Sequence, residues 1–133
     1  MHPLAAHRPL LHSLVMAIAL LPAAVVMADR DAGREVYRKH CQACHQPGGE
    51  GIRGAFPPLL NNPNIKDKPD HIARSIIDGK SGALTVNGET YHGFMPAMAQ
   101  LTDENIAAVI HFILAEWNEN PTTYSTDQVK SLR

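Results

Sequence analysis

The chain has 133 residues, of which 44% are hydrophobic and 19% charged, with a formal net charge of −1. This length corresponds to one domain with at most a short appendage. The near-neutral charge, with dispersed lysines and arginines, argues against a nucleic-acid-binding protein, because neutralising phosphates needs a clustered basic face. Aromatic residues make up only 5%, although small domains usually rely on large rings to complete a core. The composition therefore suggests that the side chains alone do not supply enough large apolar groups to complete the core.

The first 28 residues have the pattern of a secretory signal peptide. A basic residue, Arg8, precedes an apolar stretch from Leu14 to Met27, after which the sequence becomes polar. The alternative, a retained membrane anchor, needs roughly 17–25 apolar residues, whereas this stretch is shorter and contains Pro22. We therefore expect residues 1–28 to be removed on export and residues 29–133 to form one domain in the periplasm.

Both cysteines lie in the tetrapeptide Cys41-Gln42-Ala43-Cys44. An exported protein with two cysteines would ordinarily carry a disulfide. A gap of two residues, however, closes only a small strained ring that restrains little of the unfolded chain. We therefore interpret the pair as reactive or ligating rather than structural.

The first part of the mature chain is predicted to be one helix followed by a long loop. The helix is predicted over Asp31–His45, because Asp29 or Asp31 can cap it and because Val36, Tyr37 and His40 share one face. Residues 46–64 are dense in glycine and proline, which predicts a loop. No internal repeat or low-complexity run accompanies these elements.

A second helix and a hairpin are predicted next. The helix spans Pro69–Asp78, because proline suits a helix start and Gly79 suits a helix end. Asn87-Gly88 lies between two short extended runs, Leu84–Val86 and Glu89–Tyr91. It predicts a tight hairpin, because both residues tolerate positive φ. These elements lead toward the last part of the chain.

The last helix has the strongest amphipathic pattern in the sequence. Thr102 is its predicted N-cap, and acidic residues follow at its positive end. Its apolar positions recur at helical spacing: Ile106, Val109, Ile110, Ile113, Leu114 and Trp117. After Pro121 the sequence has few apolar anchors besides Val129 and Leu132. We therefore expect a largely buried final helix and a tail with few contacts.

The strongest chemical signal is Cys41-Gln42-Ala43-Cys44-His45. Two thiols three residues apart at a helix end can each add to one vinyl group of a haem, forming two thioether bonds. The adjacent histidine then lies under the ring, where an imidazole nitrogen can bind iron. This is the attachment pattern of c-type haem. Cys41, Cys44 and His45 are therefore the predicted covalent and axial ligands of one haem c.

Two other interpretations of the cysteine pair fit the sequence less well. A thioredoxin-like site needs a strand–helix context, and no strand is predicted before the motif. A zinc site needs four ligands with closed geometry, but the sequence has no second cysteine pair. The remaining histidines of the mature chain are scattered: His40, His71, His92 and His111.

A haem with one histidine ligand needs a second axial ligand or an open site. Loss of the leader leaves two methionines, Met95 and Met98, both ahead of the last helix. A thioether ligand stabilises ferrous iron and raises the reduction potential, which suits an electron carrier. Pro96 stiffens the segment after Met95. We therefore predict Met95 as the second ligand, with Met98 as the alternative and His92 as a third candidate.

These motifs resemble those of the class I c-type cytochromes over nearly the whole mature chain. The matching positions are Gly33, Tyr37, Pro57-Pro58-Leu59, Met95-Pro96-Ala97 and the helix that starts at Leu101. The hairpin before the methionine segment and Trp117-Asn118 are similar to cytochrome modules of periplasmic dehydrogenases and some terminal oxidases. This second similarity does not name a partner.

The resemblance implies an all-α fold of three to four helices around one covalent haem, with a short hairpin before the methionine loop. It implies that the first and last helices cross closely, with Gly33 as the small residue and Phe112 as the facing aromatic. It further implies that the Pro57 carbonyl accepts a hydrogen bond from His45, which fixes the tautomer and basicity of the ligand.

Further haem contacts are expected around the loop after the attachment motif. Phe56, Pro57 and Leu59 are the predicted surroundings of the haem. Arg53 or Tyr91 is a candidate hydrogen-bond donor to a haem propionate, a solvated surface role being the alternative.

The sequence thus predicts a periplasmic carrier of one electron, not an enzyme, that forms transient complexes with redox partner proteins. It predicts no nucleic-acid partner, no membrane span after cleavage, and either a monomer or a subunit of a dehydrogenase or reductase complex. The alternatives are a cytochrome subunit tightly bound to such a complex, and a haem sensor or peroxidase with an open sixth site. Because haem would complete the core, the apoprotein is predicted to be largely unfolded.

Overall fold

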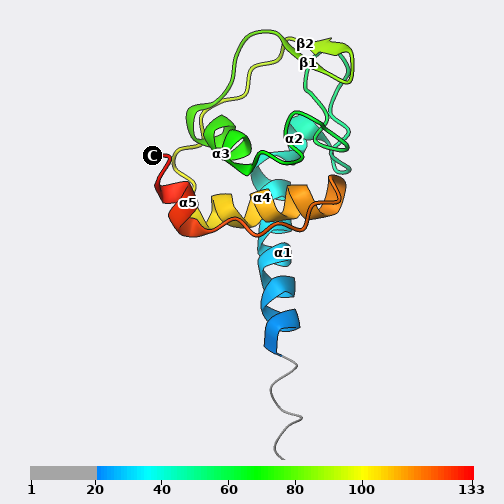
Figure 1. The fold of residues 1–133 in the computed structure, drawn as a ribbon. Coiled ribbons are helices and arrows are strands. Elements are labelled where there is room, and N and C mark those ends of the chain that lie inside the picture. Colours follow the sequence, from blue (N-terminus) through cyan, green and yellow to red (C-terminus); the bar gives the residue numbers. More distant parts are fainter. Residues whose placement is uncertain (1–20) are drawn as a thin grey trace, which may run out of the picture.

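The computed structural model describes residues 21–133, which form five helices and one hairpin (Figure 1). The helices are α1 (Leu21–His40), α2 (Gln42–His45), α3 (Pro69–Asp78), α4 (Asp103–Trp117) and α5 (Thr126–Lys130). The two strands, β1 (Leu84–Val86) and β2 (Glu89–Tyr91), pair antiparallel. The predicted mainly helical class is confirmed. The structure has five helices instead of the predicted three to four because the count includes two short ones, α2 with four residues and α5 with five.

Most of the predicted signal peptide lies outside the described residues. Its last part, residues 21–28, forms the beginning of α1. None of the helices within the described part of the chain has both the length and the apolar character needed to cross a membrane. Cleavage after Ala28 therefore stays a prediction.

The first helix differs from the prediction at both ends. It begins at Leu21 instead of Asp31, because a proline is tolerated in a first turn and the alanines and methionine that follow favour helix. It ends at His40 instead of His45, since Cys41 leaves the ideal helical conformation with φ −118°. The chain then forms the separate turn α2, where the amide of His45 donates to the carbonyl of Cys41 at 2.9 Å. The attachment motif therefore occupies its own short helical turn.

Helices α1 and α4 cross in close contact (Figure 1). Gly33 is buried at the crossing, where a Cβ atom would lie 2.2 Å from the carbonyl oxygen of Ala108 and 2.8 Å from Cβ of Phe112. Any side chain at this position would force the helices apart. The expected contact between Gly33 and Phe112 is confirmed, and it fixes the helix that leads into the attachment motif.

Helix α4 supplies much of the hydrophobic core. Thr102 caps its N-terminus by accepting a hydrogen bond from the amide of Asn105 at 3.2 Å. The residues predicted for its apolar face are all buried: Ile106, Val109, Ile110, Ile113, Leu114 and Trp117. Complete burial of one large aliphatic side chain contributes about 1.5–3 kcal/mol. Helix α4 therefore anchors α1, α3 and α5, which pack against it.

Helix α3 and the hairpin have the predicted boundaries. Gly79 follows α3 with φ 74°, a conformation that ends the helix. Asn87 and Gly88 join the strands with φ values of 50° and 82°, as a tight turn with two positive φ angles requires. The hairpin lies on the side of the domain remote from α5 (Figure 1), and the methionine segment follows it directly.

The C-terminal tail has more contacts than the sequence suggested. Tyr124 is buried, and its hydroxyl donates to the carboxylate of Asp70 on α3 at 2.7 Å. Val129 of α5 is fully buried. Ser125 and Gln128 form a capping box at the start of α5, and their spacing was a sequence signal for this helix that our prediction did not use.

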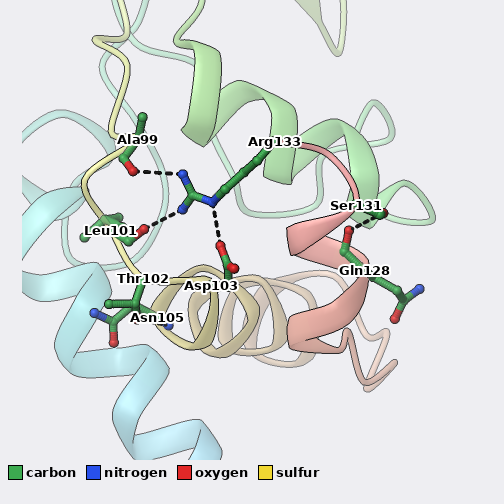
Figure 2. Close-up of polar contacts among 8 residues, drawn as sticks. All are labelled: Ala99, Leu101, Thr102, Asp103, Asn105, Gln128, Ser131 and Arg133. Atoms are coloured by element: carbon green, nitrogen blue, oxygen red, sulfur yellow. Dashed lines mark hydrogen bonds and ion pairs between the residues drawn. The ribbon is translucent and has the colours of Figure 1, made fainter.

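Arg133 links the end of the chain to the segment before α4. Figure 2 shows its guanidinium among the carbonyl oxygens of Ala99 and Leu101 and the carboxylate of Asp103. The two carbonyl contacts measure 2.8 and 2.6 Å. Arg133 thus holds the stretch of chain that connects Met98 with α4.

Candidate functional site

A mostly apolar cleft lies between α2, the loop after it and the segments on either side of the hairpin. It encloses about 700 Å³, its open mouth included, which is within the range of small-molecule and cofactor sites. The residues that line it are His40, Cys41, Cys44, His45, Phe56, Pro57, Lys80, Gly82, Leu84, Tyr91, Gly93, Phe94, Met95, Pro96 and Met98. The cleft thus brings together the attachment motif and both candidate methionines.

The two cysteines line the cleft as free thiols. Burial, and to a smaller extent the neighbouring Cys44, raises the pKa of Cys41 to about 12. A thioredoxin-like pair would need a depressed pKa instead. Among residues 21–133, no three His, Cys, Asp or Glu side chains converge as a metal-binding group. The pair is suited to holding a covalently attached group in the cleft.

His45 ends α2, is buried and lines the same cleft. Its Nδ1 lies 2.9 Å from the carbonyl oxygen of Pro57. Because a carbonyl only accepts hydrogen bonds, Nδ1 carries the proton and Nε2 keeps its lone pair. Burial lowers the pKa of the imidazole, and the hydrogen bond to Pro57 opposes this effect. The ring is therefore neutral near pH 7, the form that binds metals, and the hydrogen bond implied by the resemblance is present.

The close approach of His45 and Pro57 depends on Gly51. The φ angle of Gly51 is +69°, and a Cβ atom there would lie 2.3 Å from the carbonyl oxygen of Phe56 and 2.8 Å from that of Pro57. The amide of Gly51 donates to the carbonyl of His45 at 2.9 Å. The loop after the attachment motif is thus folded back tightly enough to present the Pro57 carbonyl to the histidine.

Met95 and Met98 line the cleft from the segment after the hairpin, and both side chains pack against the hydrophobic core. Met95 pairs with Lys80 in an isolated antiparallel bridge, where its amide and its carbonyl each form a 2.9 Å hydrogen bond. The amide of Met98 donates to the carbonyl of Ile76 on α3 at 2.8 Å. His92 is exposed and does not line the cleft. Two thioether groups are therefore available as donors, and His92 is disfavoured.

The other predicted haem contacts separate into two groups. Phe56 and Tyr91 line the cleft. Leu59 packs against the hydrophobic core and is not among the lining residues, so its contact with haem stays a prediction. Arg53 is exposed and pairs with Glu89 at 2.9 Å. The geometry thus favours Tyr91 over Arg53 as a donor to a propionate.

Several cleft residues were not predicted from the sequence, among them His40, Lys80, Leu84 and Phe94. Lys80 reaches the cleft through its bridge with Met95, a tertiary pairing that leaves no local pattern in the sequence. Phe94 directly precedes the predicted ligand and is 67% exposed, whereas large apolar rings usually prefer burial. No sequence signal distinguished it from a core residue.

The residues of the cleft fit a covalently attached haem. They combine two free thiols, an imidazole with an available nitrogen, and thioether side chains from a second segment. These are the donors that c-type haem uses. The mostly apolar lining also suits a large flat ring, which would supply the core material that the aromatic side chains do not.

The chain belongs to the cytochrome c family, whose family model, described as "Cytochrome c", matches residues 31–117. It is 35% identical over 123 residues to cytochrome c-552 of Thermus thermophilus, covering 86% of this chain and 82% of that protein. It is 33% identical over 90 residues to cytochrome c6 of Leptolyngbya boryana, covering 65% and 92%. It is also 36% identical over 107 residues to the cytochrome c subunit of a quinone alcohol dehydrogenase of Gluconobacter oxydans, covering 77% of this chain and 22% of that subunit.

Membership of this family confirms four of the predictions. The fold is the small, mainly helical cytochrome c fold, and the cofactor is one covalently bound haem c. The function is electron transfer, and the protein is an electron carrier rather than an enzyme.

Proposed function

We propose that the protein is a periplasmic one-electron carrier whose haem iron is bound by His45 and Met95. The observation that carries this proposal is the joint lining of one cleft by His45 and Met95, with the Nδ1 proton of His45 held on Pro57. That hydrogen bond leaves Nε2 as the nitrogen available for iron. Cys41 and Cys44 line the same cleft as the predicted covalent attachment points.

Each residue of the cleft has a distinct role in this proposal. When bound, haem supplies the Fe(III)/Fe(II) couple. His45, held by Pro57, is a correctly oriented and more basic ligand. The thioether of Met95 favours the ferrous form and so raises the reduction potential. Phe56 and Leu84 line the cleft and would limit the access of water to bound haem, which suits transfer of an electron without a bound substrate.

Met95 is preferred to Met98 because its backbone is held from two directions. The bridge to Lys80 fixes both its amide and its carbonyl, and Pro96 restricts the backbone that follows. Met98 is tied through its amide to Ile76 and is proposed to fill the wall of the cleft, a common role of methionine.

The oxidised visible spectrum of holoprotein, made in a host that attaches c-type haem, tests this ligation. A weak far-red band from a sulfur–iron bond is expected. It should disappear in Met95→Ala and persist in the matched control Met98→Ala. Persistence of the band in Met95→Ala would overturn the assignment.

Two further observations would separate the alternatives. Haem that acidified acetone removes from the protein would contradict covalent attachment through the cysteines. Rapid binding of carbon monoxide or cyanide by the resting protein would support a sensor or peroxidase with an open sixth site. Slow binding is expected for an iron that carries both ligands.

We also propose that residues 1–28 direct export and are then removed, leaving residues 29–133 in the periplasm. The support is the order of basic, apolar and polar sequence in this segment. The intact mass of the protein recovered from the periplasm of an expression host tests this proposal. A mass equal to that of residues 29–133 plus one haem is expected. A retained leader in membrane-bound protein would favour an anchor instead.

The second candidate function is a cytochrome subunit of a dehydrogenase complex. The similarity to the cytochrome c subunit of a quinone alcohol dehydrogenase favours it, although this chain spans only 22% of that subunit. Purification from the native source discriminates between the two. A free carrier elutes as a monomer that meets its redox partners transiently, whereas a subunit elutes with its dehydrogenase.

A further inference from the structure

A buried asparagine, Asn118, ties the end of α4 to the loop that contains Pro57. Its side chain is among the least accessible in the described part of the chain, at 1% exposure. Its Oδ1 accepts from the amide of Asn62 at 3.0 Å, and its Nδ2 donates to the carbonyl of Leu59 at 2.9 Å. A further Nδ2 contact of 3.2 Å reaches the carbonyl of Ile113 within α4. Asn118 thus bonds to both a donor and an acceptor of the loop backbone.

A second buried asparagine continues this network toward the histidine. Asn62 is 3% exposed and donates from Nδ2 to the carbonyl of Pro58 at 2.7 Å. Pro58 follows the proline whose carbonyl accepts from His45. The neighbouring loop amide, that of Asn61, is also bonded to the end of α4. Hydrogen bonds therefore link Asn118 to Asn62 and Asn62 to Pro58. The adjacent Pro57 then bonds to the imidazole of His45.

We propose that Asn118 is a positioning residue that keeps the Pro57 carbonyl aligned with Nδ1 of His45. This inference rests on the proposed binding of iron by His45. An imidazole that donates a strong hydrogen bond from Nδ1 is a more basic ligand, which favours ferric iron. Asn118 therefore holds the reduction potential below the value that a slack loop would give.

A role confined to ending α4 would not require these contacts. The backbone amide of Asn118 already closes the helix by donating to the carbonyl of Leu114 at 3.2 Å. Only one of the three side-chain bonds remains within α4, and the other two reach the loop at Leu59 and Asn62. Without Asn118, these loop groups would lose their partner in a buried setting, which is costly.

The test compares Asn118→Ala with Asn120→Ala in the holoprotein. Asn120 is the matched control, because its Nδ2 donates to the carbonyl of Lys66 at 2.7 Å and to the carboxylate of Asp67 at 3.2 Å. Within the described residues, its side chain makes no hydrogen bond to the segment 57–62. In Asn118→Ala, the ferrous-to-ferric ratio at a fixed potential should rise by up to about tenfold, equivalent to about 59 mV for one electron. The Nδ1 proton of His45 should also exchange faster with solvent.

A second variant, Asn62→Ala, removes the next bond in the path. Its reduction potential should move in the same direction. The double variant Asn62→Ala/Asn118→Ala should shift the potential by less than the sum of the two single effects, because both act through one loop. If Asn118→Ala yields no holoprotein, the single variant Asn62→Ala alone tests whether the network sets the reduction potential.

An unchanged potential in Asn118→Ala, or an equal shift in Asn120→Ala, would overturn the positioning role. If Asn118→Ala cannot be made, an unchanged potential in Asn62→Ala has the same meaning. The parent spectrum separates this failure from failure of the proposed function. A parent without histidine-bound haem contradicts the proposed ligation, whereas a normal parent with unmoved variants contradicts the role of Asn118 alone.

Discussion

The histidine side and the methionine side of the cleft are built differently. The histidine side comprises α2 and the loop through Pro57, and there the proposed ligand His45 is buried, ends a helical turn and has its ring fixed by a 2.9 Å hydrogen bond. The methionine side is the segment from Met95 to Met98, which has no helix or strand. Its backbone is held by the bridge to Lys80 and by one bond to α3.

This difference indicates that the fold positions the two proposed haem ligands with different firmness. The histidine is positioned by secondary structure and by a buried network that reaches α4. The methionine depends on a few backbone bonds in a partly exposed segment, next to Phe94, which is 67% exposed. Regions with few buried contacts open first in native proteins. We therefore expect the iron to keep His45 and to lose Met95 when the domain opens locally.

The largest expected effect comes from removing each proposed ligand in turn. His45→Ala should yield little or no folded holoprotein, because the haem would lose its ligand on the rigid side. Met95→Ala should remain folded with His45 bound, lose about 2 kcal/mol of stability, and bind cyanide readily. Denaturant unfolding followed by circular dichroism measures the stabilities. Equal losses of stability in the two variants would contradict the proposed difference between the histidine side and the methionine side.

A loss of stability smaller than that of His45→Ala is expected from Gly33→Ala, which lies on neither side of the cleft. A Cβ atom there would meet the Ala108 carbonyl at 2.2 Å, and overpacking of this kind costs about 1–3 kcal/mol. The midpoint of thermal unfolding should fall while the far-red band persists. Ala32→Gly, at an exposed position of the same helix, is the control and should cost about 1 kcal/mol from helix propensity alone. Loss of the band in Gly33→Ala would show that the crossing acts on the methionine side.

Much of this architecture could be predicted from local sequence. The attachment motif, the proline and glycine at the ends of α3, and the Asn87-Gly88 turn each carry a short-range physical signal, and the structure has these elements at the predicted places. The helix break at Cys41 had no such signal, because the residues around it are compatible with a continuous helix. The first helix was therefore predicted with the wrong bounds.

A smaller effect is expected from Arg133→Ala, which removes contacts next to the methionine side of the cleft. Arg133 bonds the carbonyls of Ala99 and Leu101, which follow the methionine segment (Figure 2). Its loss should cost about 1 kcal/mol and accelerate cyanide binding, because the segment would open more often. Arg38→Ala, which removes an exposed ion pair with Glu35, should leave the cyanide rate unchanged. Equal rates in both variants would contradict a role for Arg133 on the methionine side.

The smallest effect is expected from Glu35→Gln on α1. The hydrogen bond from Arg38 lowers the pKa of this exposed carboxyl from 4.5 to about 2. A depressed pKa stabilises the folded state above pH 4.5, and this contribution is lost as the pH falls toward 2. The variant should therefore differ slightly from the parent in denaturant unfolding at pH 7, and the difference should shrink on acidification. A difference that grows at low pH would contradict this cause.

The contacts that the sequence could not predict are long-range and polar. Asn118 meets Asn62, and Tyr124 meets Asp70, across more than fifty positions of the chain. Hydrogen bonds of this kind depend on the completed fold and leave no periodic pattern in the residues. The resemblance to c-type cytochromes implied the Pro57 carbonyl as the partner of His45, but the residues that hold that loop became visible only in the structure.

The most direct test of the asymmetry is native-state hydrogen exchange of the holoprotein. The amides of Cys41 and His45 are bonded on the histidine side, and those of Lys80 and Met95 on the methionine side. Local opening predicts that the Lys80 and Met95 amides exchange at least about tenfold faster than the other two. Equal protection of the four amides, or slower exchange at Met95, would contradict the account.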